Sequence, residues 1–206
     1  MPSQRLLRFG GAALVVIAVL QLLCTIFDPD LTADPRAIQH PAWIPTHLGF
    51  AVVYTLVLPG LVAMYLRQAH SLGWLGETGF VLAMFGSVLT VAISTLVGIS
   101  LPLLAPQFPD LARSLDYFEP GRPLHSMQPA VALTALTYFP GFVITGIVTA
   151  RAGVFSRWAG VLLALGALGT LGALAGPGFT GRAITIAGSC CLAAAFTRFG
   201  WQLMAE

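Results

Sequence analysis

Three of the four histidines are the residues of this chain with the widest choice of chemistry. His47 stands at the start of an apolar run, His125 comes shortly before another, and His40 lies in a polar stretch with three aspartates. Imidazoles together with carboxylates are ligands that zinc and other transition metals take from proteins. They also act as general acids and bases near neutral pH, for example on a lipid headgroup or a quinone. The pattern therefore predicts a candidate metal site made of His40, His47 and His125.

The spacing of these histidines matches no established metal motif, so a structural role is the alternative. The chain contains neither H-x-x-x-H nor H-E-x-x-H. Histidines at a membrane interface commonly cap a helix or bond to lipid headgroups. Haem fits less well than a transition metal, because membrane bundles that carry haem place the axial histidines inside their helices and these candidates lie at the ends.

Hydroxyl groups inside the apolar runs form a second candidate set. Ser87, Thr90 and Ser94 recur at spacings of three and four, which places them on one helix face. Most such hydroxyls bond to carbonyls of their own helix, whereas a minority line cavities for lipophilic molecules with one or two polar groups. The candidate ligand-binding residues are His47, His125, Gln128, Tyr54, Tyr138 and Ser94.

The elements that must position these residues are membrane helices. The chain has 206 residues, of which 57% are hydrophobic and 9% are charged, whereas soluble domains carry about 25% charged residues. A soluble core of this size could not bury so much apolar surface. We predict one all-α integral membrane domain over residues 1–206. The net charge of +2 is too small to indicate nucleic-acid binding, so membrane lipids are the expected partners.

Six apolar segments are long enough to cross a bilayer core, which takes about 20 residues. Turn-rich polar stretches separate them. Thr46 is the predicted N-cap of the second helix, and a short interfacial helix is predicted within 108–118. The six predicted membrane helices cover residues 9–27, 47–66, 77–104, 129–150, 158–175 and 182–201.

The arginines and tryptophans set the predicted orientation. Six spans place both termini on one side, which collects six of the ten arginines. The positive-inside rule then puts the N- and C-termini in the cytoplasm and the protein in the cell membrane. An aromatic belt is predicted from Trp74, Trp158 and Trp201 at the inner interface and Trp43 at the outer one. The three candidate histidines fall on the outer side.

A weak internal repeat relates the second and third segments to the fourth and fifth. Pro59-Gly60 matches Pro140-Gly141 at an offset of 81 residues, and Gln128 is then the counterpart of His47. Both hairpins run in the same direction, as in a parallel repeat. Matched proline kinks can splay helices and leave a cavity between them. The alternative is that proline and glycine only shape the packing, as they often do in membrane helices.

Charged residues are missing from the middle of every predicted span. Proton relays and ion pathways use such residues, so this pattern disfavours pumps and ion-coupled transporters. The glycine-rich segment 158–175 indicates close packing inside the bundle or, alternatively, a contact between subunits. The stretches 40–47 and 60–68 resemble parts of uncharacterised bacterial multi-pass proteins, a resemblance that implies no activity.

Two functions of different classes follow from these observations. In the first, the protein binds or acts on a lipophilic ligand in a cavity that opens at the outer face, with His47 and His125 at its mouth. Whether the protein is then an enzyme stays open. In the alternative, it is a non-catalytic accessory subunit of a larger membrane complex, or a homo-oligomer. A facilitative transporter for a neutral solute is a third hypothesis, and the apolar middles of the first, fifth and sixth spans disfavour it.

Overall fold

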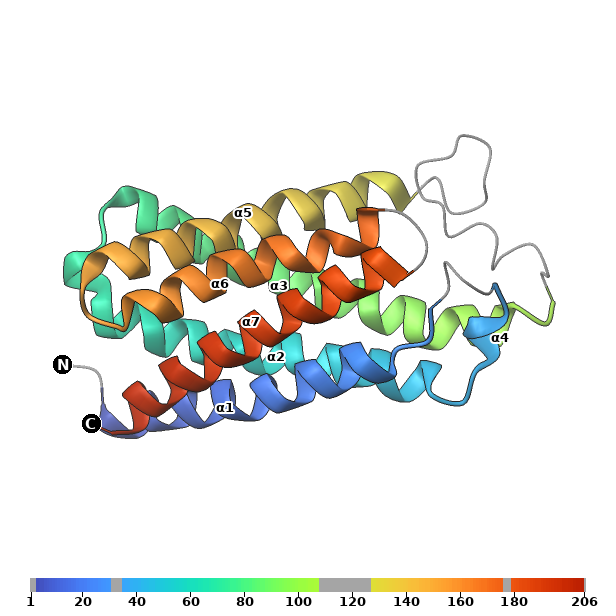
Figure 1. The fold of residues 1–206 in the computed structure, drawn as a ribbon, viewed down its shortest axis with the longest axis horizontal. Helices are drawn as coiled ribbons and strands as arrows, with labels where there is room; N and C mark the ends of the chain where they lie inside the picture. Colours follow the sequence, from blue (N-terminus) through green and yellow to red (C-terminus); the bar gives the residue numbers. More distant parts are fainter. Residues whose placement is uncertain (1–2, 31–34, 108–126, 176–178, 206) are drawn as a thin grey trace.

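The described chain consists of helices that pack side by side into one bundle (Figure 1). The computed structural model describes residues 3–30, 35–107, 127–175 and 179–205, and these contain no strand. The long helices are α1 (Gln4–Phe27), α2 (Trp43–Gln68), α3 (Trp74–Thr95), α5 (Gln128–Ala152), α6 (Arg157–Gly169) and α7 (Phe179–Met204). Shorter helical segments are η1 (Pro35–Gln39), η2 (Ala69–Ser71), the π-helical η3 (Leu96–Ser100), α4 (Leu101–Leu104) and η6 (Thr170–Ala175).

Five of these helical stretches are long and apolar enough to cross a membrane, with mean hydropathies between 1.4 and 2.4. They are α1, α2 with η2, α3 continued to α4, α5 and α7. Their outer faces carry large apolar side chains, such as Val81 (65% exposed) and Leu136 (69% exposed). Exposed apolar surface on this scale is unfavourable in water and is what a bilayer accommodates. The fold is therefore compatible with an all-α, multi-pass membrane protein.

The predicted fifth span, residues 158–175, differs from the other five. The α-helix α6 has 13 residues, and the chain then continues as the 3₁₀ segment η6. The apolar helix over Arg157–Gly172 is shorter than the other five. The predicted count of six spans is thus not confirmed, and the parallel repeat also stays a prediction.

The long helices pack in the order α1, α2, α3, α5, α6 and α7, and α7 returns to α1. The beginning of α1 and the end of α7 lie together (Figure 1), where Gly11 packs against Gly200. We call this end of the bundle the terminal end; it also holds the turns 69–73 and 153–156. The opposite end, where α1 stops at Phe27 and α2 begins at Trp43, is called the Asp28 end.

Glycines set the close approach of α6 to its neighbours. A Cβ atom on Gly160 would lie 2.6 Å from backbone atoms of α5, and one on Gly169 would lie 2.6 Å from the Cα of Gly188 in α7. Small residues allow helix backbones to approach this closely. The glycines of α6 therefore face the bundle, as predicted for a helix packed within it, and do not favour a contact between subunits.

The predicted start of the second helix is wrong by four residues. The helix α2 begins at Trp43 with Ala42 as its N-cap, so Thr46 lies in the first turn and is not the cap. Its hydroxyl oxygen lies within hydrogen-bond distance of the Ala42 carbonyl (2.9 Å) and the Trp43 carbonyl (3.0 Å). Pro45 is tolerated there because N–H groups of a first turn have no partner within the helix. Pro45 therefore lies inside α2, whereas the predicted helix over residues 47–66 began after it.

Candidate functional site

A pocket of about 230 Å³ lies between α2 and α3, near the Asp28 end of the bundle. Helix α2 contributes aromatic rings to it, and α3 contributes hydroxyl groups and aliphatic side chains. Its lining residues are His47, Phe50, Tyr54, Thr90, Ile93, Ser94 and Val97. Three of the predicted ligand-binding residues, His47, Tyr54 and Ser94, therefore share one cavity.

The α2 wall of the pocket continues a row of rings along one helix face. Trp43, His47, Phe50 and Tyr54 follow one another at spacings of four, three and four residues. The Trp43 and His47 rings stack with their centroids 4.2 Å apart, and the next two centroid distances are 6.3 and 6.4 Å. The row gives the pocket a mostly apolar wall with one imidazole in it.

Trp43 corrects the prediction of an outer aromatic belt. Its side chain is only 3% exposed, whereas Trp74 and Trp158 at the terminal end are each 76% exposed. The indole is buried because it stacks on His47 and donates its N–H to the carbonyl of Val97, 3.4 Å away. Trp43 thus ties α2 to the segment that follows α3.

The α3 wall carries two hydroxyl groups with different partners. Thr90 donates to the carbonyl of Gly86 at 2.8 Å, which is the bonding expected of a hydroxyl within a helix. Among the described residues, the hydroxyl of Ser94 has no hydrogen-bond partner. Ser87, on the same predicted face, is fully buried and bonds to the carbonyl of Ala83. Ser94 is therefore the α3 hydroxyl that a ligand could engage.

The π-helical segment η3 completes the pocket, and Pro102 explains why it forms there. Proline has no N–H to donate to the carbonyl four residues earlier (Gly98) or five residues earlier (Val97). The Val97 carbonyl accepts from the Trp43 indole instead. Gly98 lies so close to the Cβ of His47 that a side chain there would overlap it. The widened turn and the missing side chain of Gly98 thus allow η3 to pack directly against His47.

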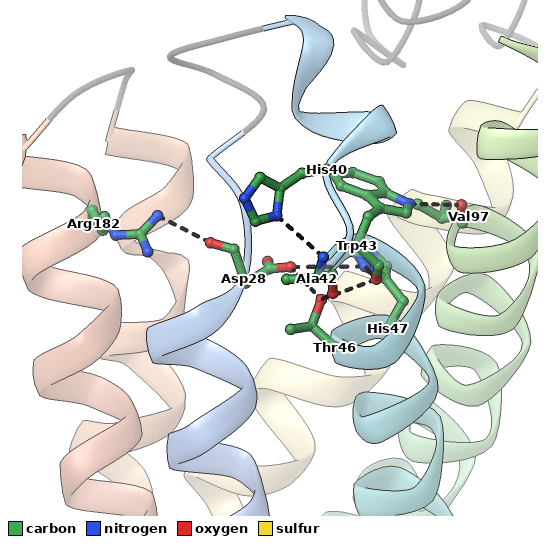
Figure 2. Close-up of polar contacts among 8 residues, drawn as sticks. All are labelled: Asp28, His40, Ala42, Trp43, Thr46, His47, Val97 and Arg182. Carbon is green, nitrogen blue, oxygen red and sulfur yellow. Dashed lines mark hydrogen bonds and ion pairs between the residues drawn. The ribbon is translucent and has the colours of Figure 1, made fainter. Parts of the chain in front are cut away.

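The hydrogen bonds of His47 fix which ring nitrogen carries the proton. Nδ1 lies 3.0 Å from the carbonyl oxygen of Trp43 and 3.7 Å from Oδ1 of Asp28 (Figure 2). The carbonyl oxygen of Trp43 can only accept a hydrogen bond, so the neutral imidazole carries its proton on Nδ1. Nε2 then retains its lone pair and can accept a hydrogen bond.

Asp28 joins three helices at this end. The hydroxyl of Thr46 donates to Oδ1 of Asp28 at 3.1 Å, and Arg182 of α7 donates to the backbone carbonyl of Asp28 at 3.1 Å (Figure 2). Arg182 also donates to the backbone carbonyl of Ile26 at 3.0 Å. Burial raises the pKa of Asp28, with Asp30 adding to the rise and with His47, Thr46 and Arg182 opposing it. The carboxyl therefore binds its proton more tightly than a free aspartic acid.

The predicted three-histidine metal site is not assembled within the described residues. The Nδ1 of His40 accepts from the backbone N–H of Ala42 at 3.1 Å, a local bond of the turn before α2. Among the described residues, no group of three or more His, Cys, Asp and Glu side chains could hold a metal ion. His125 and the predicted interfacial helix within 108–118 lie outside the described residues.

Tyr138 and Gln128 do not line the pocket. The ring of Tyr138 in α5 meets that of Tyr54 edge to face with centroids 5.6 Å apart, so it stands behind the pocket wall. Gln128 is the first residue of α5 and is half-buried at the Asp28 end. Of the six predicted ligand-binding residues, three thus meet in the cavity, Tyr138 supports it, Gln128 lies apart from it and His125 lies outside the described residues.

A buried polar chain behind the pocket was not predicted. Gln21 donates to the hydroxyl of Thr25 at 3.4 Å, and that hydroxyl lies 3.0 Å from the hydroxyl of Ser189 in α7. Gln21 also interacts with the side chain of Tyr54. The sequence signal that could have located this buried polar cluster is Gln21, an amide side chain within an otherwise apolar helix. In the same way, an acidic residue directly after that helix could have indicated Asp28.

A second buried polar cluster lies at the terminal end. Gln68 donates to the hydroxyl of Thr149 at 3.0 Å across 81 residues, the offset of the predicted repeat. Both side chains are fully buried. The side-chain amide oxygen of Gln68 (Oε1) and the hydroxyl of Thr145 have no hydrogen-bond partner among the described residues. This cluster joins α2 to α5, away from the pocket.

The pocket combines a largely apolar wall with the imidazole of His47 and the hydroxyl group of Ser94, which is unpartnered among the described residues. Such a surface can hold an apolar molecule and orient it through one polar group. Searches against protein-family models, curated proteins and solved structures found no match for this chain. The geometry of the pocket is therefore the basis on which a function is proposed.

Proposed function

We propose that this protein is a multi-pass membrane protein that binds a lipophilic ligand in the pocket between α2 and α3, with His47 at its mouth. The observation that carries the proposal is the convergence of His47, Tyr54 and Ser94 in one otherwise apolar cavity. Hydrogen-bonding groups left free in an apolar cavity are the usual means by which a protein orients a ligand.

The size of the pocket and its surroundings favour a ligand with a compact headgroup and an apolar tail. At about 230 Å³, the pocket is smaller than sites that enclose a drug-sized molecule, which hold roughly 300–1,000 Å³. Leu48, Val52 and Leu96 are exposed on the same two helical stretches. The headgroup would occupy the pocket while the tail runs along this apolar surface among the lipids.

The proposal includes six membrane spans in the cell membrane, both termini cytoplasmic and the pocket toward the outer face. The span to be added to the five long apolar helices is the predicted fifth one, which consists of α6 continued by η6, with 13 and 6 residues. At 1.5 Å per α-helical residue and about 2.0 Å per 3₁₀ residue, the pair extends about 31 Å. A bilayer core is about 30 Å thick, so this length suffices.

The parallel repeat is also part of the proposal. Pro59 and Pro140 both lie inside their helices, α2 and α5. The repeat-related residues Gln68 and Thr149 bond to each other. If the two hairpins are related, α2 and α5 occupy equivalent positions in them. The pocket described above lies in the hairpin of α2 and α3.

The experiment fills the pocket and compares the molecules that copurify with the protein. Ser94→Phe places a ring in the cavity, whereas Val88→Phe places the same ring on the exposed face of the same helix. We expect a lipophilic molecule in mass spectra of the wild type and Val88→Phe, and its loss from Ser94→Phe. Equal content in all three proteins would overturn the proposal.

The alternative, a non-catalytic accessory subunit of a larger complex or a homo-oligomer, has less support. The glycines of α6 pack against α5 and α7, so they leave no small-residue face for a partner. The exposed apolar side chains need only lipid as their partner. Purification in a mild detergent that yields a stable assembly with other subunits would favour this alternative.

A further inference from the structure

We infer that the ligand of this pocket is recognised through a neutral hydroxyl group, a phenol or an alcohol, that donates its O–H to Nε2 of His47. This inference rests on the proposed function and adds the class of headgroup. The observation behind it is that, in the neutral imidazole, the contact of Nδ1 with the Trp43 carbonyl leaves Nε2 as an acceptor, whereas the hydroxyl groups of the pocket can either donate or accept.

The first step concerns the proton of the imidazole. The nearest polar neighbours of Nδ1 are the Trp43 carbonyl oxygen at 3.0 Å and the Asp28 carboxyl oxygen at 3.7 Å. A carbonyl oxygen can only accept, so Nδ1 must donate to it. A neutral imidazole with its proton on Nδ1 can only accept at Nε2, and its partner must therefore be a donor.

The second step concerns the orientation of the ring. The indole of Trp43 stacks on one face of the imidazole, with centroids 4.2 Å apart, and Phe50 meets it edge-on. Gly98 of η3 packs against the Cβ of His47. Nδ1 is bonded to the Trp43 carbonyl and lies beside Asp28, and His47 also lines the pocket, so we infer that a ligand meets the edge of the ring that carries Nε2.

The third step excludes other headgroups. The hydroxyls of Tyr54 and Ser94 can each donate or accept, so they fit either kind of ligand. Among the seven described residues that line the pocket there is no Lys or Arg. A phosphate or carboxylate headgroup would have no counter-charge there, and Asp28 beside His47 disfavours an anion further. A neutral donor satisfies the pocket without placing a charge in its largely apolar interior.

The test compares two probes that differ only in the hydrogen-bond donor. 4-Octylphenol carries an O–H group, and 4-octylanisole carries a methyl ether on the same ring and tail. We expect the wild type in detergent to bind the phenol about tenfold more tightly by calorimetry, the scale of one hydrogen bond in an apolar site. Ser94→Phe supplies the background from partition into micelles.

His47→Asn is the matched variant, because the asparagine amide can still donate to the Trp43 carbonyl but has no acceptor at the position of Nε2. We expect it to bind both probes with nearly equal affinity. A tenfold preference that persists in His47→Asn would overturn the inference, as would equal binding of the two probes by the wild type. If the wild type binds the two probes equally and Ser94→Phe abolishes this binding, the proposed function stands and only the inference about the headgroup fails. If Ser94→Phe binds the probes as well as the wild type does, both the inference and the proposed function fail.

Discussion

The two ends of the bundle complete their helices in different ways. At the terminal end, α5 closes locally: Gly153 follows it in the left-handed conformation, with φ of 71°, and the next helix begins four residues later. At the Asp28 end, the last carbonyls of α1 are bonded by Arg182, more than 150 residues away in the chain. One end is built from short turns and the other from side chains that must come from a distance.

This difference matches the distribution of polar groups that a ligand could use. The terminal end buries its polar pair, Gln68 and Thr149, completely. The Asp28 end leaves Asp28 and His47 partly accessible and places a cavity beside them. Local turns and close backbone packing make a rigid end, whereas an end assembled from long-range side-chain contacts can hold polar groups in a cavity.

The largest expected effect comes from breaking the packing near the terminal end. In Gly160→Val the new Cβ would lie 2.6 Å from the backbone nitrogen of Ala150 and the carbonyl oxygen of Gly146, neither of which can move alone. We expect a loss of roughly 3 kcal/mol in the free energy of unfolding, measured by denaturation in detergent. Gly73→Ala is the control: nothing lies within 4 Å of its Cβ, so its effect should stay within about 0.5 kcal/mol. Equal stability of the two variants would contradict the close packing of α5 and α6.

A smaller effect is expected at the Asp28 end from Arg182→Gln. This change removes the two hydrogen bonds that the guanidinium donates to the carbonyls at the end of α1. Because the side chain is only half-buried, we expect a loss of about 1–2 kcal/mol and faster amide hydrogen exchange in the last turn of α1. Arg198→Gln, an exposed arginine of the same helix, should change stability by less than about 0.5 kcal/mol. Indistinguishable exchange rates in the two variants would argue against the link.

The smallest effect is a dependence of stability on pH. The folded protein binds the proton of Asp28 more tightly than the unfolded chain does, because burial raises its pKa above the ordinary 3.8. The contribution of Asp28 to stability is therefore full below pH 3.8 and is lost as the pH rises through the raised value. Asp28→Asn should remove this part of the slope in unfolding midpoints measured from acid to neutral pH.

Two variants sharpen the pH experiment. His47→Asn removes a group that opposes the rise, so the loss of stability should move to higher pH. Glu77→Gln, an exposed residue at the terminal end, should leave the slope unchanged. A slope that Asp28→Asn does not alter would show that this carboxyl titrates alike in the folded and unfolded chains.

Hydrophobic length and helical spacing predicted the long helices and part of the pocket. The apolar runs located the long helices because about 20 apolar residues define a span independently of their neighbours. Ser94 and Tyr54 were found because hydroxyl groups in apolar helices are conspicuous. The predicted start of α2 was wrong because a proline can either precede a helix or lie in its first turn, and the sequence does not distinguish the two positions of Pro45.

The contacts around His47 could not be predicted in the same way. Asp28, His47 and Arg182 meet only because α1 packs between α2 and α7. The burial of Trp43 depends on the carbonyl that Pro102 leaves free in η3. Periodicity within one segment carries no information about which distant segment will lie beside it.

The bond from Arg182 to α1 also bears on the order in which the protein is made. The first helix leaves the ribosome with its last carbonyls unbonded, and their partner follows 154 to 156 residues later. Backbone carbonyls without a partner are costly in lipid, so in the proposed membrane protein the end of α1 would stay near water or headgroups until α7 is inserted. Closure of the helix ring at the Asp28 end is therefore a late event of biogenesis.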